Sequence, residues 1–209
     1  TGSVVGVKEG KSPLNREFDV VLENVYFGEK SWEKAESKIQ KEAVVQALKN
    51  AGMQSTDIDY ALGGDLLNQC VSSHYAMRDL QIPFLGVYGA CSTMAESMII
   101  GAMAVSGGFA HNVVCATSSH FCSAEKQFRF PLDYGGQRPP SAQWTVTGGG
   151  CAVLTDQKDT VRIESATPGK IIDMGISDLN NMGAAMAPAA ADTITAHFKD
   201  FGVDETRYD

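Results

Sequence analysis

The sequence predicts an α/β fold in which helices cover a parallel or mixed sheet. Between residues 31 and 118, helical patterns alternate with short apolar runs typical of buried strands. Residues 94–105 are almost wholly uncharged, which predicts a central buried helix surrounded by protein on every side. A segment near the end of the chain also resembles one near its start. Together these patterns indicate a sheet-and-helix unit that begins to repeat.

Composition limits the classes of protein to consider. The chain has 209 residues, enough for one large domain or two small ones, and a net charge of −8. No stripe of Lys and Arg is present, which argues against nucleic acid as a partner. The first residues contain no basic segment followed by an apolar one, so we expect no signal peptide, and a start without Met suggests a chain that begins mid-protein or was trimmed.

The cysteines indicate a reducing, intracellular protein. They are odd in number, lie mostly in apolar segments and form no C-x-x-C pair, which argues against a disulfide framework and a zinc site. The sequence contains neither a phosphate-binding loop nor a pattern of metal ligands, so we expect no metal. The five cysteines are Cys70, Cys91, Cys115, Cys122 and Cys151.

The first elements follow from caps and apolar spacing. Residues 4–7 suggest a first strand. Ser31 is placed to cap a helix over 34–49, whose apolar positions recur at helical spacing, and Gly52 is placed to end it. Residues 58–64 then predict a strand that ends just before an aspartate.

The middle of the chain predicts a helix, a buried strand, the central helix and a further buried strand. These are residues 66–80, 84–88, 94–105 and 112–118, in that order. The central helix is too short to span a membrane, because about 20 apolar residues would be needed. Ligands of such sheets gather beyond the carboxyl ends of the strands. Asp65, Cys91 and the group Ser118, Ser119 and His120 are all expected at that edge.

The following segment differs in kind. Residues 121–145 mix aromatic residues, arginines and prolines too irregularly for a regular element, which suggests a functional or oligomeric loop. The glycines at 148–150 lead into a short strand at 151–154. Residues 161–167 alternate as a half-exposed strand that could pair with it as a hairpin through the polar turn at 156–159.

The internal repeat suggests a second copy of the unit. Residues 202–209 resemble residues 52–59 at three positions, and a helical pattern precedes each segment. We therefore expect a first half over residues 1–167 and the truncated start of a second over 168–209, with its helix beginning near Ala187. The alternative is that any helix followed by a glycine turn looks like this.

Cys91 falls at the N-terminus of the predicted central helix. Free N–H groups and the helix dipole stabilise a thiolate and attract anions there, and Gly89 and Ala90 leave room for a ligand. The competing interpretation is a small, buried, apolar residue, as most lone cysteines are. The local residues leave both interpretations open.

A duplicated α/β unit with a cysteine at the start of a buried helix resembles the thiolase and ketoacyl-synthase superfamily. Longer strings are similar to the stage V sporulation protein AD family of spore-forming bacteria, and the similarity extends over essentially the whole chain. The strings lie at residues 64–69, 89–93, 116–120, 127–131, 134–137 and 185–194.

The resemblance implies a thiolase-like fold and a binding protein for dipicolinic acid or its calcium chelate. It implies a part in uptake of that molecule into spores and its release during germination. It further implies a longer full-length protein, a peripheral position on the spore inner membrane, other stage V sporulation proteins of the same operon as partners, and a homodimer. No cofactor is implied.

Cys91 aligns with the thiolase nucleophile, whose catalytic His and second His or Asn come from the second half. Because the resemblance implies a binding protein, ligand contact is the favoured role of Cys91. The alternative is an acyltransferase or condensing enzyme that uses Cys91 on coenzyme A thioesters. A third possibility is a scaffold in which only the loop at 121–144 matters.

The expected ligand site combines donors at the helix start with groups at the strand ends. Several of its residues also suit a purely structural role: Asp65 could cap a helix or touch calcium, the glycines could form a tight turn, and the group at 118–120 could be a solvated loop. Arg129 and Arg138 could draw in a dianion or serve a subunit contact. His74, His111 and His197 are expected on the surface. The candidate ligand-binding residues are Gly89, Ala90, Cys91, Ser92, Thr93, Asp65, Ser118, Ser119, His120, Gly148 and Gly149.

Overall fold

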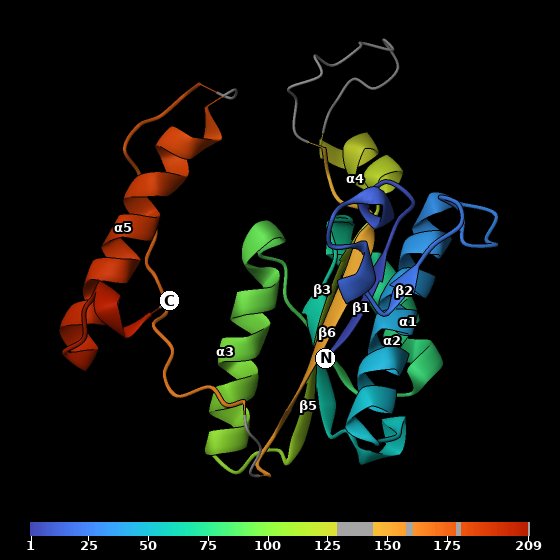
Figure 1. Cartoon of the computed structure of the whole chain (residues 1–209), viewed down its shortest axis with the longest axis horizontal. Helices are drawn as coiled ribbons and strands as arrows, with labels where there is room; N and C mark the ends of the chain where they lie inside the picture. The colour runs from blue at the N-terminus through green and yellow to red at the C-terminus, as the bar shows by residue number, and fades with distance from the viewer. Residues whose placement is uncertain (129–143, 158–160, 179–180, 209) are drawn as a thin grey trace. The chain divides into compact units, whose positions relative to one another are not determined.

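The computed structural model describes residues 1–128, 144–157, 161–178 and 181–208 (Figure 1). The chain divides into two compact units, residues 1–158 and 159–209. Arg129 and Arg138, and most of the predicted loop at 121–145, lie outside the described residues.

The first unit is built on a six-stranded sheet with strand order β2-β1-β6-β5-β3-β4. Strand β6 runs antiparallel to β1 and β5, whereas the pairs β1–β2, β3–β4 and β3–β5 are parallel. The predicted α/β class with a mixed sheet is confirmed. The strands are β1 (Gly2–Val5), β2 (Val20–Val21), β3 (Tyr60–Gly64), β4 (Phe84–Gly86), β5 (Asn112–Ser119) and β6 (Gly148–Thr155).

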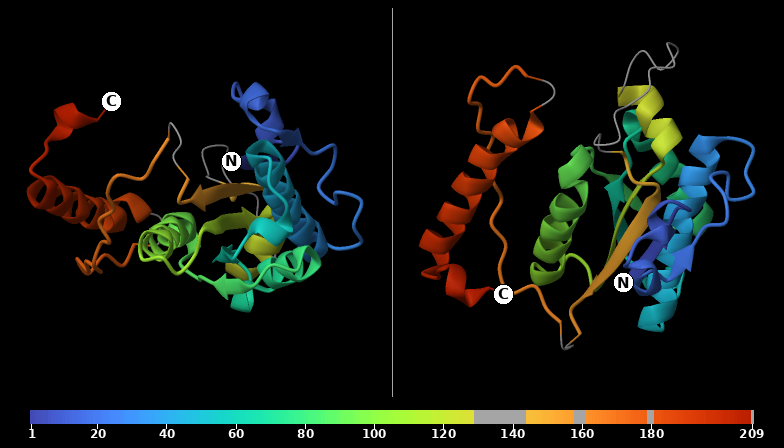
Figure 2. Two further views of the ribbon diagram at one scale, coloured as in Figure 1. Left: turned by 90° about the horizontal axis from the view of Figure 1, so that it is seen from below. Right: turned by 45° about the horizontal axis from the view of Figure 1, so that its top comes forward.

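Helices cover both faces of this sheet (Figures 1 and 2). Helices α1 (Trp32–Ala51) and α2 (Val71–Leu80) lie on one face, and α3 (Thr93–Ser106) lies on the other. The larger apolar cluster joins α1 and α2 to the sheet through residues such as Ile39 and Val114. A smaller cluster centred on Leu62 and Val113 lies beneath α3.

Helix α1 forms where the sequence predicts it. The Ser31 hydroxyl accepts a hydrogen bond of 3.3 Å from the Lys34 N–H, which caps the first turn. Gly52 ends the helix with φ of 67°, a left-handed conformation that glycine adopts without a steric penalty. The apolar stripe between these caps is buried against the sheet, and includes Ile39 and Ala43.

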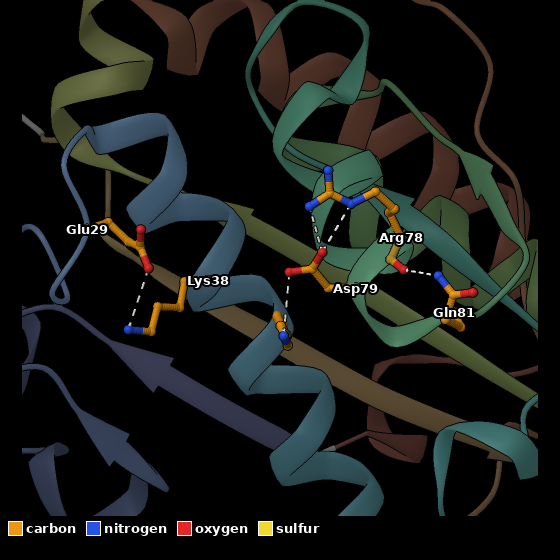
Figure 3. A network of polar contacts seen from close by, with 6 residues as sticks. Glu29, Lys38, Arg78, Asp79 and Gln81 are labelled. Carbon is orange, nitrogen blue, oxygen red and sulfur yellow. Dashed lines mark hydrogen bonds and ion pairs between the residues drawn. The ribbon is translucent and has the colours of Figure 1, made fainter.

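Exposed ion pairs join the outer faces of α1 and α2 (Figure 3). Asp79 lies 2.7 Å from Arg78 and 3.5 Å from Lys41, so one carboxylate links the two helices. Lys38 lies 3.7 Å from Glu29, which precedes α1. Solvent weakens all of these contacts, so the apolar cluster beneath them holds the helices in place.

The burial expected for two elements needs correction. The helix predicted at 94–105, now α3, is buried on one face only: Ile100 and Met103 are 43% and 60% exposed, because only the sheet packs against it in the first unit. Strand β4 is not the buried strand predicted at 84–88. Leu85 is 55% exposed because β4 lies at an edge of the sheet.

Two further predictions around β6 are wrong in part. The segment predicted to be irregular from residue 121 begins with a helix, α4 (Phe121–Phe128). The glycines at 148–150 are the first residues of β6 itself and form no turn. This strand is longer than the predicted 151–154, because its glycine end pairs with β1 on one side and β5 on the other.

The strand predicted at 161–167 does not form. Residues 161–178 contain no strand. Strand β6, the partner expected for a hairpin, already has a hydrogen-bonded neighbour on each side, so no edge is free to receive another strand.

The second unit contains a long helix that repeats the local structure of α1. Helix α5 (Met182–Phe201) has 20 residues, as α1 does, and ends at Gly202 with φ of 62°. A 3₁₀ turn follows at Glu205–Arg207, as one follows α1 at Ser55–Asp57. The helix starts five residues before the predicted Ala187. None of the residues of α5 is buried, in contrast to α1.

The length and hydropathy of the helices indicate whether any of them could span a membrane. Among the described residues, no helix is both long and apolar enough to cross a bilayer.

Candidate functional site

A cavity of about 580 Å³ lies at the carboxyl ends of β3 and β5, beside the start of α3. Parallel strands end at the same edge of a sheet, and this edge is where the sequence places the ligand. The cavity is lined by Ser3, Val4, Val5, Phe18, Gly64, Asp65, Leu66, Ala90, Cys91, Thr93, Met94, Thr117, Ser118, Ser119, Thr145, Val146, Gly148, Gly149 and Gly150.

The structure brings most of the predicted site residues together. Three of them, Gly89, Ser92 and His120, are not part of the cavity lining. The predicted residues that line it are Asp65, Ala90, Cys91, Thr93, Ser118, Ser119, Gly148 and Gly149.

Cys91 lies in a short 3₁₀ turn at the beginning of α3 and is exposed. This exposure excludes the interpretation of a small, buried, apolar residue. By contrast, burial raises the pKa of Cys115 and Cys151 to about 12, so those two thiols stay protonated at neutral pH. Ala90, just before Cys91, has φ of 50°, a left-handed conformation that costs energy for a residue with a Cβ atom.

Gly89 and Ser92 shape the turn around Cys91 instead of facing the cavity. The Ser92 hydroxyl lies 2.8 Å from the Gly89 carbonyl and 2.5 Å from a Glu96 carboxylate oxygen. The Gly89 N–H donates a 3.1 Å hydrogen bond to the Thr93 hydroxyl. A Cβ atom at Gly89 would clash with the Ser92 Oγ and the Glu96 carboxylate, so a larger residue would have to displace these two side chains.

Asp65 is almost fully buried at the end of β3. Both oxygens of its carboxylate accept hydrogen bonds from groups of the protein itself. One carboxylate oxygen accepts a 2.9 Å hydrogen bond from the Leu67 N–H. The other accepts hydrogen bonds of 2.7 Å from both the N–H and the hydroxyl of Ser73, in the first turn of α2. The capping role considered for Asp65 is therefore the one that its hydrogen bonds fill.

The end of β5 presents hydroxyls to both faces of the sheet. Because side chains alternate along a strand, Thr117 and Ser119 share one face and Ser118 belongs to the other. The Ser119 hydroxyl donates a 2.6 Å hydrogen bond to the Val146 carbonyl. The Ser118 hydroxyl is buried and forms no hydrogen bond of normal geometry.

His120 is fully buried between β5 and α4 and does not face the cavity. Its Nε2 lies 2.7 Å from the Val25 carbonyl and its Nδ1 lies 3.2 Å from the Cys122 N–H. Nε2 must therefore donate and Nδ1 accept, which fixes one neutral tautomer. Burial also lowers the pKa of His120. The two hydrogen bonds of its ring connect the segment before α1 to the start of α4.

The sequence reasoning missed two polar side chains behind this edge of the sheet. Glu36 and Gln40 of α1 are fully buried. The Gln40 amide donates to the carbonyls of Gly64 and Ala116, at 3.3 Å and 3.2 Å. Their spacing of four residues, next to the apolar stripe of Ile39, was a signal that these polar groups face the sheet.

Glu36 lies among few partners. One carboxyl oxygen accepts a 2.6 Å hydrogen bond from the Ser123 hydroxyl, and the other makes no hydrogen bond of normal geometry within the described residues, although the nearby Ser118 hydroxyl lowers the pKa of the group. Burial is the main cause that raises the pKa of Glu36 to about 8, and the nearby Asp65 charge adds to the rise. The carboxyl group is therefore mostly protonated at neutral pH.

Each glycine of β6 meets a different surface. A Cβ atom at Gly149 would lie 3.1 Å from Ile39 of α1, and one at Gly148 would lie 2.8 Å from the Val4 carbonyl. At Gly150, nothing lies within 4 Å of that position. Close packing thus requires glycine at 148 and leaves little room for a side chain at 149, whereas Gly150 leaves space in the cavity.

The charges at the cavity are few. Asp65 is the charged residue of the described lining, which includes no lysine, arginine or histidine. Within the described ranges, no three His, Cys, Asp or Glu side chains gather as a metal site requires. The polar groups that the cavity offers a ligand are hydroxyls, a thiol and backbone amides.

Comparison with known families gives one match over the full chain. The family model described as stage V sporulation protein AD matches residues 1–209. Stage V sporulation protein AD of Bacillus subtilis (strain 168) is 47% identical over 208 residues, which cover 100% of this chain and 62% of that protein. The chain therefore spans less than two thirds of the length of this curated relative.

Solved structures of thiolase-like ketosynthases share the fold. A type III pentaketide synthase from Neurospora crassa has a TM-score of 0.59 at 10% identity, covering 89% of this chain and 60% of that one. OleA of Xanthomonas campestris, solved with lauric acid and lauroyl-CoA, has a TM-score of 0.58 at 13% identity, covering 81% and 58%. At such identities the likeness shows the fold alone.

Proposed function

This chain belongs to the stage V sporulation protein AD family, and on that basis we propose that it binds dipicolinic acid, or its calcium chelate, in the cavity beside Cys91. In this proposal, binding serves the uptake of the ligand into bacterial spores and its release in germination. The single observation that carries the proposal is that one cavity gathers eight of the eleven residues expected to bind the ligand.

The chemistry of the cavity supports a small, flat, polar-edged ligand. Dipicolinate is a pyridine ring with two carboxylates. The hydroxyls of Thr93 and Thr117 offer donors to the carboxylates, and the positive end of the α3 dipole favours their negative charge. Val5, Phe18 and Met94 offer apolar walls to the ring.

The assembly of the whole protein is part of the same proposal. We expect a homodimer that lies peripherally on the spore inner membrane and works with the other stage V proteins of its operon. Sedimentation of the full-length protein would test the dimer, and its release from spore membranes by salt would test peripheral attachment.

Binding can be measured by titration calorimetry on the full-length protein, with dipicolinate alone and with dipicolinate plus calcium. Gly150→Val should abolish binding, because its side chain enters the cavity where no atom lies within 4 Å of a Cβ. Gly86→Val in β4 is the matched control, since its Cβ meets nothing closer than 3.5 Å and lies outside the cavity lining. Saturable binding that Gly150→Val leaves intact would refute this site.

An acyltransferase or condensing activity is the second candidate, because Cys91 is an exposed thiol at a helix start within the cavity. No histidine of the described residues lines the cavity to act as its base. Incubation with acetyl-coenzyme A followed by mass spectrometry separates the two candidates. A stoichiometric adduct on Cys91 would favour the enzyme, whereas dipicolinate binding without an adduct would favour the binding protein.

A further inference from the structure

Glu36 lies directly behind the cavity and takes no part in the proposed binding. It belongs to α1, on the face of the sheet opposite α3, and is fully buried. Its Oε2 accepts a hydrogen bond from Ser123 of α4, and its Oε1 makes none of normal geometry within the described residues, although the Ser118 hydroxyl is close enough to lower the pKa of the group. Its neighbour Ser118 is itself part of the cavity lining. The carboxyl group is therefore separated from the cavity by little more than the end of β5.

Among the described residues, three buried oxygen atoms of this region form no hydrogen bond of normal geometry. They are Glu36 Oε1, Gln40 Oε1 and Ser118 Oγ. Glu36 Oε1 and Gln40 Oε1 can only accept while Glu36 is a carboxylate, whereas the Ser118 hydroxyl can also donate, so the three atoms share a single hydrogen atom. A proton on Glu36 supplies a second. The arrangement therefore suits a neutral carboxylic acid better than a carboxylate.

The charged groups that face Glu36 also favour its protonated form. Asp65, at the end of β3, and Glu33, on α1 itself, are both acidic and raise the pKa of Glu36. Ser118 and Ser123, from β5 and α4, are neutral and lower it only in part. His120, next to Ser123, is buried as the neutral tautomer. No described cation is among the causes that shift the pKa of Glu36, so only the two serine hydroxyls offset the effect of burial.

We propose that the proton on Glu36 controls whether the cavity accepts an anion. While the carboxyl group is neutral, the described lining presents an anionic ligand with one acidic side chain, the buried Asp65. Once Glu36 loses its proton, a second buried negative charge lies behind the cavity and repels the ligand. By linkage, a bound anion must hold the proton on Glu36 more tightly by the same factor. This inference rests on the proposed function only in taking this cavity as the ligand site.

Alkylation of Cys91 tests the proposal without dipicolinate. The probes are iodoacetate, which is an anion, and iodoacetamide, which is neutral and otherwise similar. Mass spectrometry of the peptide that contains Cys91 measures the alkylation rate of this cysteine separately from that of the others. The Cys91 thiolate attacks the methylene carbon of either reagent and displaces iodide, so the ratio of the two rates cancels the ionisation of the thiol and reports the local charge. We expect the iodoacetate-to-iodoacetamide ratio to fall about two- to tenfold between pH 7 and pH 9 as Glu36 ionises.

Glu36→Gln is the matched variant, because it keeps the size and polarity of a neutral carboxyl group and cannot ionise. Its ratio should stay constant over the same pH range and equal the wild-type ratio at pH 7 or below. A flat wild-type ratio would overturn the proposal, and that measurement does not depend on the folding of any variant. A fall of equal size in Glu36→Gln would overturn it as well.

Dipicolinate titrations on the same two proteins distinguish this proposal from the proposed function. Affinity that falls above pH 8 in wild type and not in Glu36→Gln supports both. If dipicolinate binds neither protein while the alkylation ratio still changes in wild type alone, the proposed function is refuted and the control of the cavity by Glu36 is supported.

Discussion

At the scale of single residues, the turn before α3 combines exposure with an unfavourable backbone. Cys91 is exposed in the cavity, and Ala90 before it has φ of 50°. Gly89, Ser92 and Glu96 fix this turn through contacts that do not involve the thiol. Local hydrogen bonds therefore offset the backbone strain that presents Cys91 to the cavity.

Replacement of Ala90 by glycine should stabilise the protein. Glycine adopts a positive φ without the Cβ penalty, so we expect the free energy of unfolding to rise by about 0.5–1 kcal/mol. Urea unfolding measures this difference. Gly52→Ala is the control of opposite sign, because it places a Cβ at φ of 67° and should lower the free energy of unfolding by about 1 kcal/mol. A loss of stability in Ala90→Gly would contradict the strain.

Glu36 should make the stability of the protein depend on pH. Its pKa in the folded state is about 8 and its ordinary value is 4.5, so between these pH values the folded state binds more protons than the unfolded state. The free energy of unfolding should therefore fall as pH rises through this window, by up to about 1.4 kcal/mol per unit. Above pH 8 no further loss is expected from this group.

Urea unfolding of wild type and Glu36→Gln at pH 5, 6.5 and 8 measures this contribution. His120 has the opposite effect, since its lowered pKa makes stability rise with pH near its ordinary value of 6.5. Both proteins contain His120, so the difference between them isolates Glu36. Parallel pH profiles would show that Glu36 does not titrate in this window.

At the scale of elements, the glycines of β6 have different roles on the two faces of the sheet. Gly149 faces α1, where a Cβ would lie 3.1 Å from Ile39, whereas the Cβ position of Gly150 meets no atom within 4 Å. Alternation along the strand sends these residues to opposite sides. The first glycine thus permits close packing of helix on sheet, and the second leaves room in the cavity.

Valine at each position should separate these roles. Gly149→Val should lower the free energy of unfolding by about 1–3 kcal/mol, because its side chain is forced against α1. Gly150→Val should change stability by less than about 1 kcal/mol, since β-branched residues suit strands and space is present. Thermal unfolding of both variants measures the difference. Equal destabilisation would show that β6 does not divide its faces in this way.

At the scale of the whole molecule, two helices of equal length have different surroundings. Helices α1 and α5 each have 20 residues, a side chain that caps the first turn and a left-handed glycine after the last. Eight residues of α1 are buried, whereas none of α5 is. Isolated helices are marginal in water, so burial decides how stable each one is.

Amide hydrogen exchange should reveal this difference. We expect the central amides of α1 to exchange only on global unfolding, and those of α5 to exchange at least about 100-fold faster through local opening. Mass spectrometry of peptides from residues 35–48 and 185–198 of this chain measures both. Equal protection in the two helices would contradict the difference in burial.

Much of the fold was predictable from the sequence, because the signals are local. Ser31 and Gly52 set the ends of α1, and apolar runs gave β3 and β5. The repeat of a helix, a left-handed glycine and a 3₁₀ turn at α5 is also a local pattern. The division of the chain into halves near residue 167 stays a prediction.

The site was predictable only in part, because it depends on which way side chains point. Strand ends placed Asp65, Ser118 and Ser119 at the correct edge of the sheet. His120 follows the same strand, yet its ring turns toward Val25. No local signal distinguishes these directions, since partners far along the chain decide them.

By itself, the sequence determined the fold class, elements such as α1, β3 and β5, and the edge of the sheet where the cavity lies, because propensity, capping and apolar spacing act over a few residues. Only the tertiary structure decided that α3 is buried on one face, that β6 has no free edge for another strand, and that Glu36 lies protonated behind the cavity. These properties arise from contacts between distant segments, and burial and charge follow from those contacts.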